Sequence, residues 1–171
     1  MSDDGSYIVT AQGSSERAAN LPPTLRLWRG DTGGHIKTVD AHAGGVWSVA
    51  IPPDSRAVLS GGPDRTLKIW SLPDLTLLKT IEYGAGVSAI AVSPDGKFAL
   101  VGHGSVIDIL RMEDGINVGQ ISDHEGAVKK IAIAPDGSFI ASGDLGVGVR
   151  MWKEAPQMAP PRGVERPRQG Q

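Results

Sequence analysis

The sequence predicts an all-β fold in which a unit of short antiparallel strands is repeated along the chain. The first observation is a recurring turn: residues 93–96 read Ser-Pro-Asp-Gly, residues 134–137 read Ala-Pro-Asp-Gly, and residues 52–55 give a weaker copy, Pro-Pro-Asp-Ser. The second is that His42 and His124 lie 82 residues apart, and that steps of 42, 40 and 42 residues separate Trp28, Trp70, Leu110 and Trp152. A shared period near 41 residues indicates internal repeats.

The interior of each repeat consists of short β-rich runs separated by turn residues. Lys68 between Leu67 and Ile69 shows the period-two alternation of a half-buried strand. Gly, Pro, Asp or Ser bounds each run, which is typical of hairpin turns. Four such runs in each period predict a four-stranded antiparallel blade per repeat, and a series of such blades predicts a β-propeller. In the second repeat we expect strands at 46–51, 57–60, 66–70 and 77–81.

The composition excludes several classes of function. The chain has 171 residues with 17 basic and 19 acidic side chains, which gives a net charge of −2. This balance lacks the basic footprint of a nucleic-acid-binding protein and gives no signal for a membrane surface. No apolar run reaches the roughly 18 residues of a membrane span. Cysteine is absent, which excludes disulfides, cysteine nucleophiles and thiolate metal sites. We therefore expect neither nucleic acid nor a membrane as a partner.

Two segments of the second repeat resemble a WD40 repeat closely. They are Ala-His-Ala-Gly-Gly-Val-Trp-Ser-Val-Ala at 41–50 and Ser-Gly-Gly-Pro-Asp-Arg-Thr-Leu-Lys-Ile-Trp at 60–70, and the resemblance covers nearly all of residues 1–153. It implies a WD40-type propeller in which a histidine, a serine, an aspartate and a tryptophan form a hydrogen-bonded structural tetrad. A carboxylate that orients an imidazole, which orients a hydroxyl that accepts the indole N–H, is chemically consistent. Carried over, the tetrad is His42, Ser60, Asp64 and Trp70.

The other repeats depart from this pattern. The fourth repeat has Gly146 at the aspartate position, so only a partial tetrad is expected there, made of His124, Ser142 and Trp152. In the third repeat Tyr83 replaces the histidine and Leu110 the tryptophan, and no aspartate follows Gly104 in the turn. We expect the third blade to be held by apolar packing rather than by a polar network.

The repeat boundaries predict an incomplete ring. We expect blades at about 1–41, 42–83, 84–123 and 124–153, with the first lacking its first strand and the last lacking its last strand, followed by a proline-rich disordered tail at 154–171. An open arc leaves an apolar face at each end. This favours a piece of a longer propeller protein. Self-association, or completion of the ring by another chain, is the alternative.

A search for catalytic and ligand-binding patterns yields no candidate. Ser122, Asp123 and His124 have the residue types of a triad, but adjacent residues cannot supply its converging geometry. No spacing of His, Asp and Glu matches a metal site, and the glycine-rich turns match no nucleotide-binding fingerprint. We expect no enzyme activity, no catalytic residue, no metal and no cofactor.

Two features predict a surface for a protein or peptide partner. The first repeat carries an insertion between its second and third strand positions that includes Glu16, Arg17 and Asn20, and function concentrates on loops carried by rigid scaffolds. Trp47 begins the first strand of the second blade, where Ser88 and Lys129 occupy the same place in the third and fourth. An aromatic side chain on that rim either anchors a partner or packs between blades.

The sequence therefore favours a non-catalytic protein–protein interaction scaffold built from WD40 repeats. Two alternatives stay open: a propeller domain of an enzyme or sensor whose active part lies outside this chain, and a truncated, non-functional fragment. The acidic start of the chain, Met-Ser-Asp-Asp, is unlike a signal peptide, which favours a cytoplasmic location.

Overall fold

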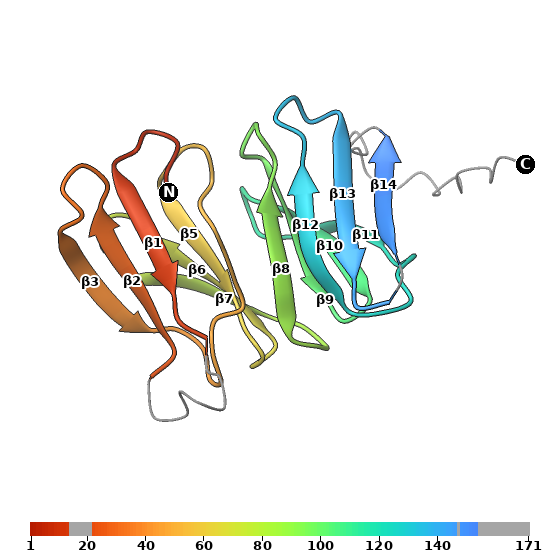
Figure 1. Ribbon diagram of the computed structural model, residues 1–171, viewed down its shortest axis with the longest axis horizontal. Coiled ribbons are helices and arrows are strands. Elements are labelled where there is room, and N and C mark those ends of the chain that lie inside the picture. The colour runs from red at the N-terminus through yellow and green to blue at the C-terminus, as the bar shows by residue number, and fades with distance from the viewer. Residues whose placement is uncertain (14–21, 147, 154–171) are drawn as a thin grey trace, which may run out of the picture.

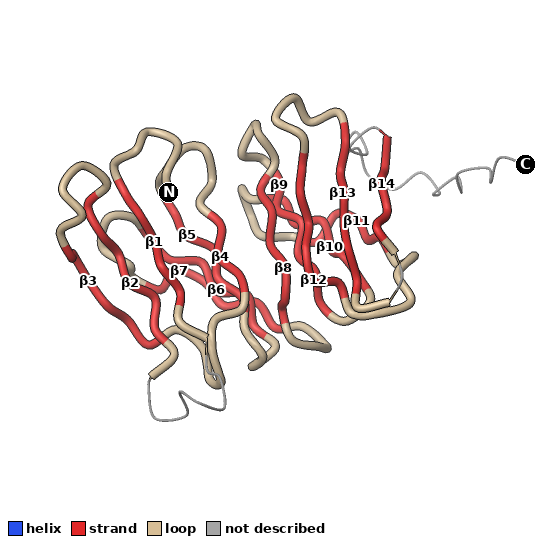
Figure 2. Tube along the Cα trace, in the orientation of Figure 1, coloured by secondary structure: helices blue, strands red, loops and turns tan. Residues whose placement is uncertain are grey.

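The computed structural model describes residues 1–13, 22–146 and 148–153, and these residues form strands joined by turns without a helix (Figures 1 and 2). The strands make four antiparallel sheets of three, four, four and three strands. The first sheet contains β1 (Tyr7–Ala11), β2 (Thr24–Arg29) and β3 (His35–Asp40). The second contains β4 (Ser48–Ala50), β5 (Ala57–Gly61), β6 (Thr66–Ser71) and β7 (Leu77–Glu82).

The third and fourth sheets repeat this order. The third contains β8 (Val87–Val92), β9 (Phe98–His103), β10 (Val106–Arg111) and β11 (Asn117–Ile121), and the fourth contains β12 (Val128–Ile133), β13 (Phe139–Asp144) and β14 (Val149–Lys153). In each sheet consecutive strands are hydrogen-bonded neighbours. The all-β fold class, with its incomplete ring of antiparallel blades, is confirmed.

The recurring turn of the sequence has one backbone conformation in all four sheets. Gly96 and Gly137 have φ values of 71° and 74°, and their N–H groups donate to Ser93 and Ala134 at 2.8 Å. Gly5 forms the same turn with Ser2 in the first sheet at 3.0 Å. Glycine suits this position because L side chains avoid positive φ. In the weaker copy Ser55 takes the position with φ 55°.

The core lies between sheets rather than inside any one of them. Three clusters of buried apolar side chains each join the strands of two consecutive sheets. Alternate residues along a strand point to opposite faces, so each inner sheet contributes to two clusters. In β6, for example, Trp70 packs with Leu25 and Leu27 of the first sheet, whereas Leu67 packs with Val87 of the third.

Hydrogen bonds between sheets supplement this packing along the innermost strands. The Ile90 backbone N–H donates to the Ser48 hydroxyl at 3.0 Å, which joins β8 to β4. The Ser88 hydroxyl donates to the Val128 carbonyl, which joins β8 to β12. The four sheets stand side by side as an unclosed arc, with β1–β3 at one end and β12–β14 at the other (Figure 1). In the part of the chain that the structure describes, no helix is long and apolar enough to cross a membrane.

Candidate interaction surface

The structure brings His42, Ser60, Asp64 and Trp70 together in the second sheet. His42 Nδ1 lies 2.9 Å from Asp64 Oδ1, and His42 Nε2 lies 2.8 Å from the Ser60 hydroxyl. The Trp70 indole N–H donates to the same hydroxyl at 2.8 Å. With Nδ1 protonated and donating to the carboxylate, Nε2 accepts the Ser60 proton, so every polar atom of this buried chain of bonds has a partner.

Burial and hydrogen bonding set the ionisation states of this group. Burial lowers the pKa of His42 below its usual value, although the Asp64 carboxylate opposes the shift. Burial alone would raise the pKa of Asp64, but hydrogen bonds from His42 and Thr66 more than offset it, so that pKa is lowered. The folded state therefore favours a neutral imidazole beside an ionised carboxylate. This arrangement locks the loop at 41–45 to the second sheet and leaves no free nucleophile or base.

The fourth sheet differs from the sequence expectation because it has its own carboxylate. Asp144 Oδ2 lies 2.9 Å from His124 Nδ1, and His124 Nε2 lies 2.6 Å from the Ser142 hydroxyl. Ser142 and Asp144 are two residues apart in β13, so both side chains point to the face that His124 covers. Gly146 at the expected position donates its N–H to Asp144 at 2.8 Å. The sequence analysis missed Asp144, although the alternation of side chains along the strand could have identified it.

The third sheet holds a polar cluster of a different kind. The rings of Tyr83 and His103 have centroids 4.6 Å apart, and His103 Nε2 lies 3.2 Å from Asp108 Oδ2. The Gln120 amide donates to Asp108 at 2.9 Å. The third sheet is held by the expected apolar packing, but the expectation that it lacks a polar network is wrong, because Asp108 is only 7% exposed and is stabilised by His103 and Gln120. Burial opposes ionisation of Asp108, but these neighbours hold its pKa below the usual range.

Trp47, Ser88 and Lys129 lie together on one rim of the arc. β-Bulges between Val87 and Ala89 and between Val128 and Lys130 leave Ser88 and Lys129 outside the strand pairing. Bulges redirect side chains, and these two occur at the same position of β8 and β12. Lys129 Nζ consequently lies 5.5 Å from the centre of the Trp47 ring, within cation–π range.

Trp47 both packs between sheets and remains accessible. A Cβ placed on Gly86 would lie 2.6 Å from Trp47 Cζ3, so the ring lies directly on the β7–β8 loop of the third sheet. The side of the ring away from this loop contributes to an exposure of 48%. Ser88 is less available because its hydroxyl is bonded to the Val128 carbonyl. The structure thus shows that Trp47 packs against the loop before β8, and that part of the side chain remains accessible.

For the insertion of the first repeat, the structure describes only the residues on either side of it. Glu16, Arg17 and Asn20 lie outside the described residues. The residue before them, Gly13, forms an isolated antiparallel bridge with Gly45, two positions before Trp47. The Val46 N–H also donates to the Gln12 carbonyl at 3.3 Å. Gln12 and Gly13, the last described residues before the insertion, therefore lie beside the residues that precede Trp47.

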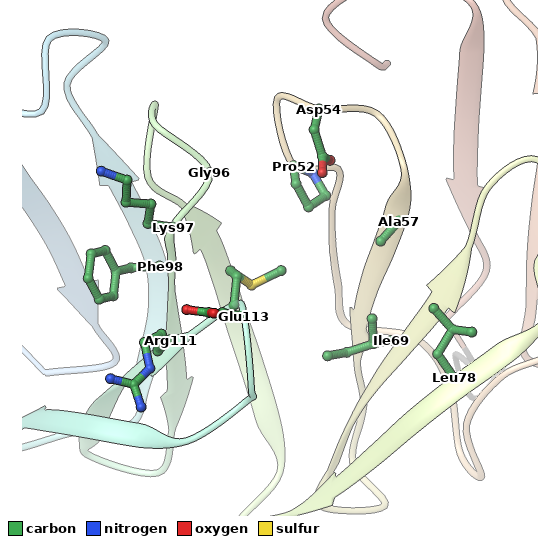
Figure 3. A pocket seen from close by; sticks show the side chains of 11 residues that line it. Pro52, Asp54, Ala57, Ile69, Leu78, Gly96, Lys97, Phe98, Arg111 and Glu113 are labelled. Carbon is green, nitrogen blue, oxygen red and sulfur yellow. The ribbon is translucent and has the colours of Figure 1, made fainter.

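A hollow lies between the second and third sheets, at the end of the strands away from Trp47. Figure 3 shows Ala57, Ile69 and Leu78 on one side of this space of about 480 Å³ and Phe98 on the other. Its charged lining is balanced, with Asp54 and Glu113 against Lys97 and Arg111. No net charge therefore selects a ligand. Among the described residues, no group of three or more His, Asp and Glu side chains is placed to hold a metal ion.

Comparison with known proteins agrees with this architecture. The family model "WD domain, G-beta repeat" matches residues 33–71 and 115–152. WD repeat-containing protein 3 from Homo sapiens is 38% identical over 55 residues, which is 32% of this chain and 6% of that protein. Eukaryotic translation initiation factor 3 subunit I from Phaeosphaeria nodorum is 37% identical over 55 residues, 32% of this chain and 17% of that protein.

A third relative also matches over a short segment. Eukaryotic translation initiation factor 3 subunit I from Xenopus tropicalis is 34% identical over 61 residues, which is 34% of this chain and 19% of that protein. The matched segments thus span less than a fifth of the length of these three relatives. Each family-model match runs from the outer strand of one sheet through three strands of the next, β3 to β6 and β11 to β14. This chain thus contains WD40, G-beta-type repeats at residues 33–71 and 115–152, within an all-β fold of four sheets arranged as an unclosed arc.

Proposed function

We propose that this chain is a non-catalytic scaffold that binds a protein or peptide on the rim formed by Trp47, Ser88 and Lys129. The observation that carries the proposal is the convergence of three equivalent positions from three consecutive sheets, with the Lys129 ammonium over a half-exposed indole. Tryptophan is enriched at binding hot spots because it buries a large apolar area with little loss of rotamer freedom. A cytoplasmic location accompanies this proposal.

The electrostatics of the rim favour a partner that supplies an apolar group and a negative charge together. The apolar group would cover the open side of the Trp47 ring, and a carboxylate would pair with Lys129 Nζ, which already lies over the ring. The segment 14–21 starts beside this rim and adds Glu16, Arg17 and Asn20 to the proposed contact. One relative is named as a subunit of a translation initiation factor, which fits a role inside an assembly.

The test is a titration with a binding partner isolated on the wild-type chain, using single variants. Trp47→Ala is expected to weaken binding by about 2 kcal/mol if the ring is a hot spot. Lys129→Glu should also weaken binding, and by more at low salt than at high salt. Deletion of 14–21 tests the third element of the surface. Leu78→Ala is the matched control, because Leu78 is 62% exposed at the opposite end of the sheet. Unchanged affinity in all three rim variants would contradict the proposal.

The competing proposal is that the chain is the propeller domain of an enzyme or sensor. It predicts that the chain binds its small-molecule ligand or its catalytic domain through the hollow of Figure 3 rather than through the rim. Under this alternative Leu78→Ala, and not Trp47→Ala, would weaken the interaction. The same pair of variants therefore separates the two functions.

A further inference from the structure

The inner sheets define what the two faces of a blade require. In the second sheet Leu59 and Leu67 point toward the third sheet and are fully buried. In the third sheet Leu100 and Ile107 occupy the same positions toward the fourth sheet and are also fully buried. We call this side of a sheet the back face. Both back faces are therefore apolar and completely covered by the next sheet.

Among the described residues, nothing covers the same back face of the fourth sheet. The strand register identifies equivalent positions: Gly61 pairs with Leu67, Gly102 with Ile107, and Gly143 with Val149. Val149 is 78% exposed and Met151, two residues along the same face of β14, is 67% exposed. The first sheet also has a buried back face, with Leu25 and Leu27, so an apolar surface that is buried three times in this chain is exposed the fourth time.

The first sheet presents the complementary side. Trp70 pairs with Val58 and lies, 4% exposed, on the Leu25 and Leu27 back face of the first sheet. Trp28 pairs with Ile8 in the same register, and its indole donates to the Thr10 hydroxyl at 2.9 Å, as Trp70 donates to Ser60. We call this side the front face. In the first sheet it points away from the other three sheets (Figure 1), the Trp28–Thr10 hydrogen bond is exposed, and Trp28 is only half-buried.

We propose that copies of this chain associate head to tail, with the front face of the first sheet of one copy on the back face of the fourth sheet of the next. The occupant follows from the chain itself: three contacts of a front face on a back face already hold the four sheets together, and each unpaired half of such a contact is present at one end. Such a contact is heterologous, so it closes a ring or extends indefinitely. Two copies contribute eight sheets, which is within the range of known propellers.

Because this contact joins two different faces, two single variants, one on each face, can test it. Met151→Lys places a charge on the back face at a site that is already accessible, so the fold should persist. Trp28→Glu places a charge on the front face, and Ile8→Glu repeats the test if Trp28→Glu unfolds. Leu78→Lys is the matched control, since Leu78 is similarly exposed but lies on β7, an outer strand that belongs to neither end face.

The measurement is sedimentation velocity with the full 171-residue chain over a concentration series, with circular dichroism to verify folding. The wild type and Leu78→Lys should double in mass as the concentration rises. Met151→Lys and Trp28→Glu should each remain monomeric to at least about tenfold higher concentration. An equimolar mixture of these two variants should form a two-chain species, because one wild-type front face and one wild-type back face remain.

Four results would overturn the proposal. A wild-type chain that stays monomeric at all concentrations shows that the end faces do not bind each other. Equal loss of association in Leu78→Lys shows that the association is a general effect of apolar surface. Failure of the two variants to associate when mixed shows that a front face does not bind a back face, and continued dimerisation of either variant alone shows a contact between like faces, as in a symmetric dimer.

Discussion

The second and third sheets have the same strand order and neighbours but different polar chemistry. In the second sheet the chain His42–Ser60–Trp70 is completed by Asp64. In the third sheet Val101 and Leu110 stand at the serine and tryptophan positions and are buried as apolar core. The buried carboxylate of the third sheet is instead Asp108 in β10, which His103 and Gln120 stabilise.

This difference shows that the blade geometry does not depend on one particular hydrogen-bond network. Packing between sheets is the shared requirement, because the two inner sheets bury apolar residues on both sides and each end sheet buries them on one side. The polar groups must be paired once they are buried, but several pairings satisfy that condition. The fourth sheet is a third solution, in which the carboxylate comes from the end of β13.

The largest expected effect comes from removing the tryptophan that links network and core. Trp70→Ala leaves a cavity against Leu25 and Leu27 and deprives the Ser60 hydroxyl of a donor, so we expect a loss of about 3–5 kcal/mol in the free energy of unfolding. Trp28→Ala in the exposed pair of the first sheet should cost clearly less. Urea unfolding measures both, and similar losses would contradict the assigned role of Trp70.

The next effect separates the carboxylates of the second and fourth sheets. Asp64 accepts bonds from His42, from Ala43 N–H and from the Thr66 hydroxyl and N–H, so Asp64→Ala should cost about 2–4 kcal/mol. Asp144→Ala should destabilise in the same direction but by less, since it removes fewer hydrogen bonds, those from His124 and from the backbone of Gly146 and Gly148. Thermal unfolding of the two variants is the measurement. Indistinguishable midpoints would show that the number of bonds does not set the cost.

The pH dependence sharpens the contrast between the second and third sheets. The lowered pKa of His42 means that the unfolded chain takes up a proton before the folded one, so stability should fall as the pH drops below about 6.5. The lowered pKa values of Asp64 and Asp108 add a second loss below their ordinary range near 3.8. Melting temperatures between pH 7.5 and 3 test this. His42→Gln should flatten only the upper part of the curve and Asp108→Asn only the acid part; the reverse pattern would contradict the assignment.

The smallest expected effect concerns the outer edge of the sheets. Lys79 Nζ donates to the Asp114 carbonyl of the third sheet at 2.6 Å, as Lys37 does to Asp74 of the second. Gly119 stands at the equivalent position of the third sheet. Lys79→Met keeps the apolar stem and should cost under about 1 kcal/mol, because the bond is exposed. A larger loss in the unfolding free energy would mean that the edge bonds, rather than the core, hold the arc together.

Much of this arrangement could be predicted from the sequence of a single repeat. The turn residues and the strand alternation placed the strands of the second repeat to within a few residues, because these are local preferences of the backbone. The position of Asp144 was also readable in principle, since Ser142 and Asp144 share a face of one strand. The cluster of Tyr83, His103, Asp108 and Gln120 was not, because its members come from three separate strands and the segment before β8, and they fit no repeated pattern.

The sequence by itself determined the repeat, its period and the residues that close each turn, since these follow from conformational preferences over a few positions. Only the tertiary structure decided which side chains meet across sheets. Lys129 reaches Trp47 because bulges in successive inner strands redirect side chains toward one rim, and Gly86 leaves room beneath the ring. Likewise, Val149 and Leu67 hold equivalent positions in sequence, yet one is open and the other fully buried. Burial depends on the neighbouring sheet, which a single repeat does not contain.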